Sequence, residues 1–244
     1  MADSPTSPPR SGTPERPRTL GRPRRTGVAP AGDPRQEILE SAARLFADRG
    51  YAATTMSEIA RSVGLGQSSV YYWFRSKEDL LLALTGANRE SLEVARRLAA
   101  AATPPPVHLY AVLHADVLQM CRGALDFYDL ERAAHAQPDS FAEILADYGQ
   151  LRAELERIVA AGMTSGDFLA GDPRAAVTAC LAQTEGVQHR FRTPTPDDAG
   201  RGAVLPDPAA AAQLAARTAV RALLADPARS AEVERAALAA GDEP

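Results

Sequence analysis

The segment Thr54–Leu80, TTMSEIARSVGLGQSSVYYWFRSKEDL, predicts two short helices joined by a glycine-containing turn. Thr55 stands before an apolar set with helical spacing, and Glu58 follows three residues later, as in a capping box. The turn Gly64-Leu65-Gly66 ends the first helix, because glycine readily adopts the left-handed conformation of a C-terminal cap. Two helices separated by such a short turn are typical of a helix-turn-helix. The apolar set is Met56, Ile59, Ala60 and Val63.

The second helix, predicted for Gln67 to Phe74, places Val70 and Phe74 on one face at i and i+4. The other faces carry amides, hydroxyls and aromatic rings, which can contact base edges, thymine methyl groups and phosphates. We therefore predict a recognition helix that binds DNA, assisted by the start of the preceding helix. The predicted contact residues are Thr55, Gln67, Ser68, Ser69, Tyr71, Tyr72 and Trp73.

A third helix is predicted to begin at Ser76, with Asp79 three residues later in a looser version of the capping box. Lys77, the only lysine in the chain, lies in its first turn. The free N–H groups and the dipole of a helix N-terminus attract anions. Lys77 is therefore predicted to bind a DNA phosphate.

Several residues of this segment together resemble a known family. The order Thr54-Thr55, Ile59-Ala60, Gly64-Leu65, Tyr71, Phe74, Ser76-Lys77-Glu78 and Leu80 is similar to the N-terminal domain of the TetR family of bacterial transcriptional regulators. The resemblance extends from Arg35 to Leu80. Two features depart from the family pattern: Gly66 replaces the usual Ser or Thr, and Tyr72 and Trp73 are bulkier than the frequent histidines.

The resemblance implies an all-α protein with a three-helix DNA-binding domain and a larger helical domain for ligand binding and dimerisation. We expect a disordered basic arm over residues 1–32, the DNA-binding domain over 33–80, the second domain over 81–230 and a short helix or tail over 231–244. The implied function is that of a homodimeric repressor, which binds a pseudo-palindromic DNA operator and is released by a small-molecule effector.

The charge distribution agrees with this division. Residues 1–80 carry 12 basic and 9 acidic side chains, whereas residues 81–244 carry 15 and 22. The net charges of the two parts are therefore +3 and −7. Positive charge is concentrated where phosphate is expected, as a nucleic-acid-binding domain requires.

The first 32 residues contain almost no large apolar side chains and cannot form a core of their own. Within them, Gly21-Arg22-Pro23-Arg24-Arg25 resembles the core of an AT-hook, in which arginines follow a narrow minor groove. Arg22, Arg24 and Arg25 are therefore candidate DNA-binding residues. A solvated basic tail with only non-specific attraction to DNA explains this segment equally well.

The rest of the chain reads as helices without β alternation. The first helix is expected to begin after Asp33 and to end at Gly50, and the helix from Ser76 is expected to continue unbroken towards Ala102. Residues 193–208, which include four prolines, are expected to form a loop. The remaining helices are predicted at 107–124, 126–136, 139–163, 173–190, 208–224 and from Ser230.

By resemblance, the helices near 173–190 and 208–225 form a four-helix bundle with a second subunit. An alanine stripe in the latter would permit close helix approach: Ala211, Ala212, Ala215, Ala216 and Ala219. The resemblance also implies a ligand pocket among the middle helices. The candidate lining residues are Tyr110, His114, Phe127, Tyr128, His135, Phe141, Tyr148 and His189, although for each one alone core packing or simple exposure is the commoner explanation.

Catalytic and metal-binding patterns are absent from the sequence. It contains no His-Glu-x-x-His, Gly-x-Ser-x-Gly or phosphate-loop motif, and Cys121 and Cys180 have no partner at metal-ligand spacing. We therefore expect no enzyme activity, no metal and no cofactor, and a cytoplasmic protein. Two alternatives remain: an architectural DNA binder that acts through the basic arm, and a ligand-binding helical protein without a specific DNA site.

Overall fold

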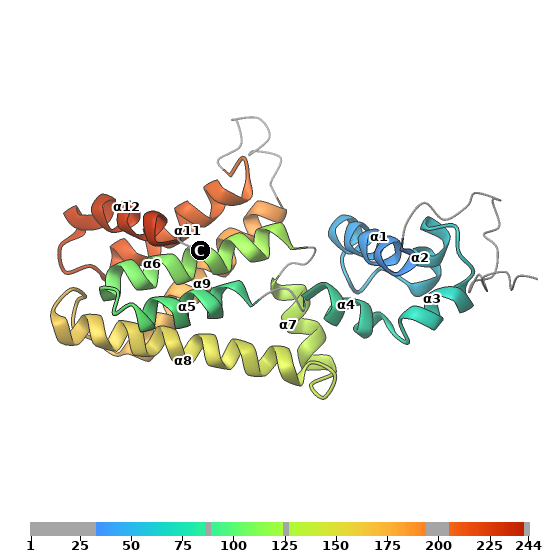
Figure 1. Ribbon diagram of the computed structural model, residues 1–244, viewed down its shortest axis with the longest axis horizontal. Helices are drawn as coiled ribbons and strands as arrows, with labels where there is room; N and C mark the ends of the chain where they lie inside the picture. The colour runs from blue at the N-terminus through green and yellow to red at the C-terminus, as the bar shows by residue number, and fades with distance from the viewer. Residues whose placement is uncertain (1–32, 86–88, 124–126, 194–204, 242–244) are drawn as a thin grey trace, which may run out of the picture.

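The computed structural model describes residues 33–85, 89–123, 127–193 and 205–241, and within these ranges the chain is helical (Figure 1). The β pairing there is limited to an isolated bridge between Phe168 and Leu224. The helices are α1 Pro34–Arg49, α2 Met56–Ser62, α3 Gln67–Trp73, α4 Lys77–Thr85, α5 Glu90–Ala100, α6 Pro105–Arg122, α7 Phe127–Ala136, α8 Ala142–Ser165, α9 Pro173–Arg192, α11 Pro208–Leu223 and α12 Ser230–Gly241, with a 3₁₀ turn at Pro227–Arg229.

The helix ends of the N-terminal domain follow the sequence signals. The Asp33 side chain accepts a hydrogen bond from the backbone N–H of Arg35, and α1 ends at Gly50, whose φ is 81°. Both halves of the capping box between Thr55 and Glu58 are present at the start of α2. Gly64 has a φ of 67°, as required of the residue that ends α2. The predicted boundaries of the helix-turn-helix are therefore confirmed.

The predicted continuous helix from Ser76 to Ala102 is wrong. The α4 helix ends at Thr85, whose hydroxyl group donates a 3.0 Å hydrogen bond to the carbonyl oxygen of Leu81, and α5 begins at Glu90. Arg89, which directly precedes α5, lies outside the helix with φ −112° and ψ 4°, so a single helix does not continue through this position.

The C-terminal domain is organised around α6. This helix packs against α5, α8, α9, α11 and α12, which surround it in Figure 1. Its residues Leu109, Val112 and Val117 are almost inaccessible to solvent on different faces of the helix. A helix that is apolar on several faces is expected to lie inside a bundle.

Of two predictions about the C-terminal end of the chain, one needs correction. The short helix expected from Ser230 is present as α12, which packs on α6 through Val233 and Ala237. The Tyr110 hydroxyl group donates a 3.0 Å hydrogen bond to Glu234 of this helix. The alanine stripe of α11 is buried within the chain, chiefly against α6, and so does not form an exposed surface.

Close packing in α8 depends on Gly162. A Cβ atom at this position would lie 2.2 Å from Cδ2 of Phe168, a ring that is 2% exposed. The backbone N–H of Phe168 donates a 3.0 Å hydrogen bond to the carbonyl oxygen of Gly162, which fixes the chain as it leaves the helix. None of the helices in the described part of the chain is both long enough and apolar enough to cross a membrane.

Candidate functional site

The α3 helix lies at the end of the molecule farthest from the C-terminal domain (Figure 1). Val70, which is buried, anchors it on α1 and α2, while Tyr72 is 72% exposed. Tyr71 and Trp73 are also exposed, and the rings of Tyr72 and Trp73 meet edge to face at 5.3 Å. Gln67 and Ser68 are exposed at the N-terminus of the helix and Ser69 is partly exposed. The predicted recognition surface is therefore accessible to a partner.

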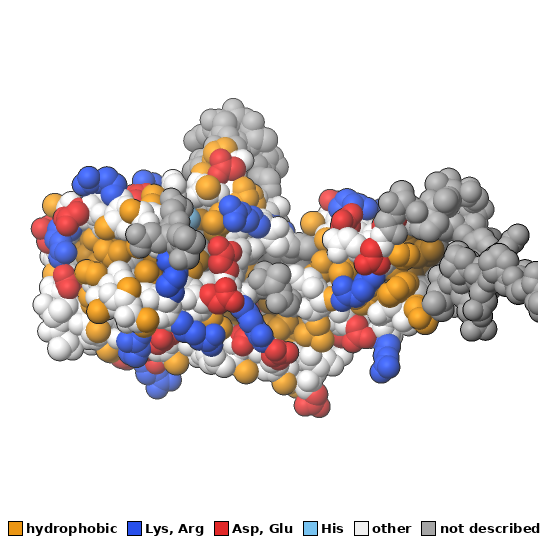
Figure 2. Space-filling view, in the orientation of Figure 1, with side chains coloured by type: hydrophobic (Ala, Val, Ile, Leu, Met, Phe, Trp, Pro, Cys, Tyr) orange, Lys and Arg blue, Asp and Glu red, His pale blue; other side chains and the backbone are white. Residues whose placement is uncertain are grey.

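Other parts of the molecule offer a less suitable surface for DNA. On the face of the C-terminal bundle shown in Figure 2, acidic and basic side chains are interspersed rather than gathered by sign. Exposed large aromatic side chains are concentrated in α3, where amide and hydroxyl groups accompany them. This combination of chemistry and access favours α3 as the element that contacts nucleic acid.

Thr55 and Lys77, two of the predicted DNA contacts, have structural partners. The Thr55 hydroxyl group donates a 2.8 Å hydrogen bond to Glu58, within the capping box of α2. The Lys77 ammonium group lies 2.7 Å from the carbonyl oxygen of Tyr51 and 3.0 Å from that of Thr54, and it sits 4.2 Å from the centre of the Tyr51 ring. Lys77 therefore joins the start of α4 to the turn between α1 and α2. These contacts do not test whether Lys77 also binds a DNA phosphate, which stays a prediction.

We expect the substitution Lys77→Met to lower the stability of the DNA-binding domain. Methionine keeps the length of the side chain but removes its hydrogen-bond donors. The Tyr51 carbonyl group keeps the backbone N–H of Thr54 as a donor, whereas the Thr54 carbonyl group loses the ammonium group, and a buried carbonyl left without a partner costs about 1–3 kcal/mol. Arg75→Met, at an exposed neighbouring position, removes the same charge and is the control. Urea unfolding of both variants measures the difference. Unchanged stability, with a salt dependence of DNA binding reduced by about one ion, would instead identify Lys77 as a phosphate contact.

The candidate DNA contacts in the basic arm, Arg22, Arg24 and Arg25, lie outside the described residues. The side chain of Phe127, a candidate ligand contact, also lies outside them.

A cavity of about 190 Å³ lies where the end of the DNA-binding domain meets the C-terminal bundle. Its walls come from the end of α4, the start of α5, and from α6, α7, α8 and α9. The apolar part consists of Leu92, Met120, Leu130, Ala134, Ile144, Leu145 and Leu151. The polar part consists of Thr85, Ser91, Asp116, Gln119, Glu131, His135, Asp147, Tyr148 and Glu185.

Asp116 forms one side of the polar end of the cavity. Its carboxylate accepts hydrogen bonds from the Ser91 hydroxyl group at 3.3 Å and from the Gln119 amide at 3.2 Å. Burial raises the pKa of Asp116 to about 6, although the hydrogen bonds from Ser91, Gln119 and Gln188 act in the opposite direction. Asp116 is thus a carboxylate that is poorly solvated in its charged form.

Glu185 and Tyr148 form the other side of the polar end. The Tyr148 hydroxyl group donates a 3.0 Å hydrogen bond to Glu185. Burial raises the pKa of Glu185 to about 7, and the nearby acidic groups of Glu131 and Asp116 raise it further, while Tyr148 and the positive charge of Arg152 lower it. The pKa of Tyr148 is itself raised, chiefly by burial and then by the charge of Glu185. Two carboxyl groups that titrate near neutral pH therefore face one cavity.

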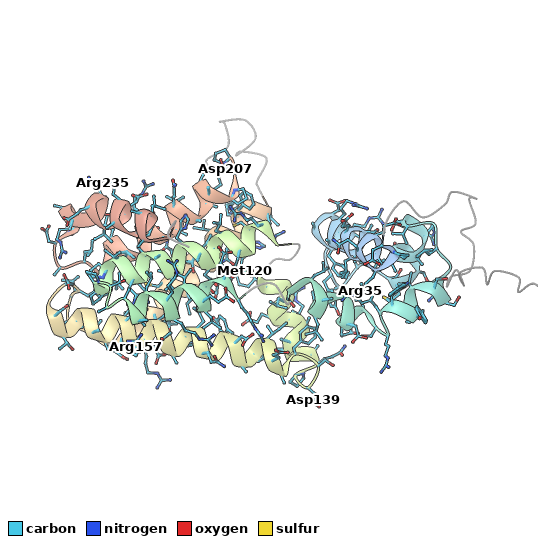
Figure 3. The ribbon with its side chains drawn as sticks, in the orientation of Figure 1. Arg35, Met120, Asp139, Arg157, Asp207 and Arg235 are labelled. Atoms are coloured by element: carbon cyan, nitrogen blue, oxygen red, sulfur yellow. The ribbon has the colours of Figure 1, made fainter. Side chains whose placement is uncertain are left out.

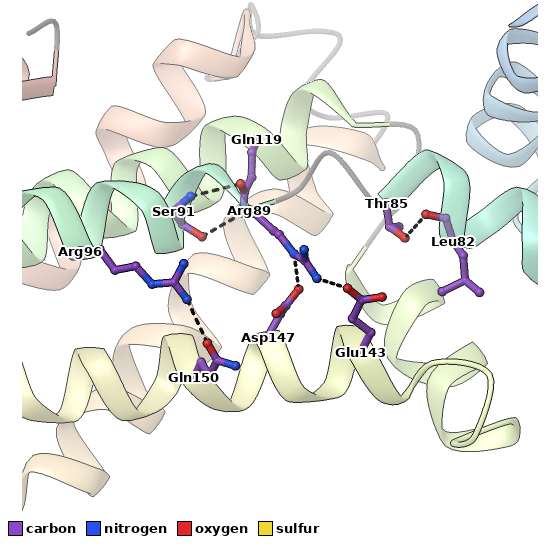
Figure 4. Close-up of polar contacts among 9 residues, drawn as sticks. All are labelled: Leu82, Thr85, Arg89, Ser91, Arg96, Gln119, Glu143, Asp147 and Gln150. Carbon is purple, nitrogen blue, oxygen red and sulfur yellow. Dashed lines mark hydrogen bonds and ion pairs between the residues drawn. The ribbon is translucent and has the colours of Figure 1, made fainter. Parts of the chain in front are cut away.

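Ion pairs at the edge of the cavity hold α5 against α8 (Figure 4). The guanidinium group of Arg89 donates to Asp147 at 2.7 Å and also to Glu143. Farther along the same two helices, Arg96 donates to Gln150 at 3.1 Å. The negative charge of Asp147 is therefore balanced locally, unlike that of Asp116.

Only some of the predicted ligand contacts line this cavity. Tyr148 and His135 do. Asp116 and Glu185 also line the cavity, but they were not among the predicted ligand contacts. The overlooked signal for Asp116 was an acidic residue in the otherwise apolar helix α6. The other candidates lie elsewhere. Tyr110 is buried in the core, and the ring of His114 stacks on it with 6.1 Å between ring centres. The rings of Tyr128 and His189 meet edge to face near the surface at 5.2 Å, and Phe141 is fully buried against the DNA-binding domain.

The α7 helix contacts both the cavity and the DNA-binding domain. Leu130 and Ala134 line the cavity and also belong to the hydrophobic core that contains α1 to α4. At the end of α7, the Gln137 amide donates a 2.9 Å hydrogen bond to Glu78 of α4, and Glu78 also accepts one from the Tyr51 hydroxyl group. The connection from α7 to α8, near Asp139 in Figure 3, therefore lies beside the DNA-binding domain. A change in the cavity can therefore reach α4 through α7, as well as at Thr85, which lines the cavity directly.

Comparisons with known proteins agree with the geometry. The sequence profile described as "Bacterial regulatory proteins, tetR family" matches residues 38–84. Over the whole fold, the crystal structure of AmtR from Mycobacterium smegmatis has a TM-score of 0.65 and 27% sequence identity, and the similarity covers 89% of this chain and 98% of AmtR. The helix-turn-helix domain of this chain is that of the TetR family. This family consists of non-enzymatic regulators with a helix-turn-helix, and the prediction that the chain is not an enzyme is confirmed on that basis.

Other TetR-family relatives match over different lengths. The transcriptional repressor KstR2 of Mycolicibacterium smegmatis is 49% identical over 47 residues, which are 19% of this chain and 23% of KstR2. Across the first three curated relatives, the match spans 17–36% of the relative's length. The structure of AibR, with isovaleryl coenzyme A and operator DNA, has a TM-score of 0.55 and 22% identity, and covers 79% of this chain and 98% of AibR. At that identity the likeness concerns the fold alone.

Proposed function

We propose that this protein is a homodimeric transcriptional repressor that binds a pseudo-palindromic operator through α3 and is released by a small molecule bound in the cavity. The observation that carries the proposal is the double role of α7. Leu130 and Ala134 contribute to the cavity wall and to the core of the DNA-binding domain at the same time.

The proposed switch uses this shared wall. A ligand that fills the cavity pushes on α7, and α7 moves α4 through Phe141 and the hydrogen bond between Gln137 and Glu78. The helix-turn-helix then changes its position relative to that of the second subunit. The ligand must bind the two conformations with different affinity, and a coupling of roughly 1–3 kcal/mol is common. AibR, which has the same fold, carries both an acyl coenzyme A and operator DNA.

A homodimer supplies the two α3 helices that a two-fold operator requires. We place the dimer contact on the outward faces of α9 and α11. On α9 this face carries small residues, namely Ala175, Ala179, Ala182 and Gly186, which are exposed. Small residues allow a partner helix to approach closely. The buried alanine stripe of α11 is not part of this proposed contact.

The test is fluorescence anisotropy of the purified protein with DNA from upstream of its own gene and with random DNA, over a series of salt concentrations. We expect selective binding that saturates at two subunits per site. If binding to both DNAs is instead equal and steeply salt-dependent, the measurement would be repeated with DNA fragments recovered by genome-wide binding. If binding to those fragments is also unselective, the protein is not a specific regulator, and non-specific binding through the basic arm is favoured. Tight ligand binding that leaves operator affinity unchanged would contradict the switch.

A further inference from the structure

The cavity has an uneven distribution of charge. Four carboxylate side chains line it, from Asp116, Glu131, Asp147 and Glu185, and none of its described lining residues is a lysine or an arginine. Asp147 is paired with Arg89 at the edge. The negative charge of the interior is therefore left for a ligand to balance.

The uncompensated charge lies at one end of the cavity. Asp116 and Glu185 come from different helices, α6 and α9, and Tyr148 of α8 bonds to Glu185 between them. The positively charged group that acts on Glu185 is Arg152, which does not line the cavity and instead pairs with Glu156 at 3.5 Å and donates to the Thr178 hydroxyl group at 2.9 Å. The aliphatic part of the lining includes Leu92, Leu130, Ile144 and Leu151.

We propose that the effector is a small amphiphilic amine, whose ammonium group binds between Asp116 and Glu185 and whose apolar part lies against α7 and α8. An ammonium group offers hydrogen-bond donors to both carboxylates and supplies the missing positive charge. A cavity of about 150 Å³ holds benzene, so this slightly larger one accepts a short alkyl or aryl group. The apolar part would then contact the residues of α7 that are shared with the DNA-binding domain.

An anionic or neutral ligand fits less well. A carboxylate or phosphate group would be repelled by Asp116, Glu131 and Glu185, with no lining cation among the described residues to accept it. A neutral alcohol could share hydrogen bonds but would leave the carboxylates uncompensated. The chemistry of the cavity thus separates ligands of equal size by their charge.

The test compares three probes with the same eight-carbon chain: octylamine, octan-1-ol and octanoate. Isothermal titration calorimetry of the full-length protein without DNA, at pH 8, measures each affinity directly. We expect octylamine to bind at least about tenfold more tightly than octan-1-ol, which corresponds to 1.4 kcal/mol, and octanoate to bind more weakly than both. Equal or tighter binding of octan-1-ol or octanoate, or no binding of octylamine in the millimolar range, would overturn the proposal.

Matched variants locate the charge that is responsible. Asp116→Asn and Glu185→Gln keep the shape and the hydrogen-bond acceptors, and together they should reduce the preference for octylamine over octan-1-ol to less than about twofold. Glu154→Gln makes the same chemical change on α8 outside the cavity, where Glu154 pairs with Arg157 at 2.7 Å, and should preserve the preference. A preference that survives in the double variant, or is lost in Glu154→Gln, would contradict the assigned site.

The pH dependence tests the proposal on the unmodified chain. The amine stays charged throughout, since alkylammonium groups resemble lysine with a pKa of about 10.4. Asp116 and Glu185 lose their protons near pH 6 and pH 7, so octylamine affinity should fall at least about tenfold between pH 8 and pH 5.5. The groups facing these carboxylates are Ser91, Gln119, Gln188, Tyr148, Glu131 and Arg152. A flat profile from pH 5.5 to pH 8 would contradict ammonium binding at these carboxylates.

This inference rests on the proposed function only in treating the cavity as the effector site. The two can fail separately. Selective octylamine binding without release of operator DNA would retain the ligand class and refute the switch. Release of operator DNA by octanoate would retain the switch and refute the ligand class.

Discussion

Replacing Gly186 with tryptophan should prevent the proposed dimer from forming and weaken operator binding by roughly 10²–10⁴-fold. Gly186 lies on the outward face of α9, and no atom of the chain lies within 4 Å of a Cβ placed there. The indole group therefore projects away from the subunit and prevents close approach of a partner helix. Operator affinity falls because each subunit then binds its half-site independently, without the gain from being joined to a second bound subunit.

Gly149 provides the control for this experiment. It is also an exposed glycine in a helix, α8, with open space where a Cβ would lie, and Gly149→Trp makes the same chemical change away from the proposed contact. Light scattering measures the mass in solution and anisotropy measures operator affinity. A Gly186→Trp protein that remains dimeric and keeps its operator affinity would show that the subunits associate through another surface.

Replacing Gly162 with alanine should destabilise the fold by about 1–3 kcal/mol, the usual effect of forcing extra volume into a packed core. The added Cβ would lie 2.2 Å from Cδ2 and 2.5 Å from Cε2 of Phe168. This ring cannot simply turn away, because Phe168 is buried and its backbone is bonded to Gly162. At this chain length, a loss of 1 kcal/mol lowers Tm by roughly 2–4 °C.

The same substitution at Gly149 should have the opposite sign. No atom lies within 4 Å of the position that its Cβ would take, and alanine in the middle of a helix is favoured over glycine by about 0.5–1 kcal/mol. Thermal unfolding of Gly162→Ala and Gly149→Ala, followed by circular dichroism, therefore compares one change at two positions of α8. A double variant that combines Gly162→Ala with Phe168→Leu should recover part of the stability lost in Gly162→Ala alone. Equal stability of both single variants would mean that the Phe168 ring shifts without penalty.

Local signals predicted the helix-turn-helix well. Thr55, Glu58 and Gly64 act on their immediate neighbours, and the structure contains the capping box and the positive φ that these residues imply. The face of α3 was predicted equally well, because burial of Val70 and exposure of Tyr72 follow from helical spacing. The turn at Arg89 was missed because the apolar spacing of Leu80, Leu84 and Leu92 continues across it.

The cavity could not be predicted residue by residue from the sequence. The ligand candidates were chosen for being polar or aromatic, but whether such a residue faces a cavity depends on contacts between distant helices. Tyr110 and Tyr148 have the same chemistry, yet one bonds to α12 and the other to Glu185 in the cavity. The structural contacts of Lys77 were missed for a similar reason, since its partners Tyr51 and Thr54 come from a turn well before it in the chain.

The arrangement of the cavity bears on how such a protein can diversify. Substitutions in α7 at Leu130 or Ala134 alter two cores at once, so a gene that acquires them changes effector response and DNA affinity together. Asp116 and Glu185 lie on α6 and α9 and do not belong to the core that the cavity shares with the DNA-binding domain. Mutations there can recruit a new signal while the operator remains the same. Descendants of one regulator could in this way come to answer different chemicals while controlling the same genes.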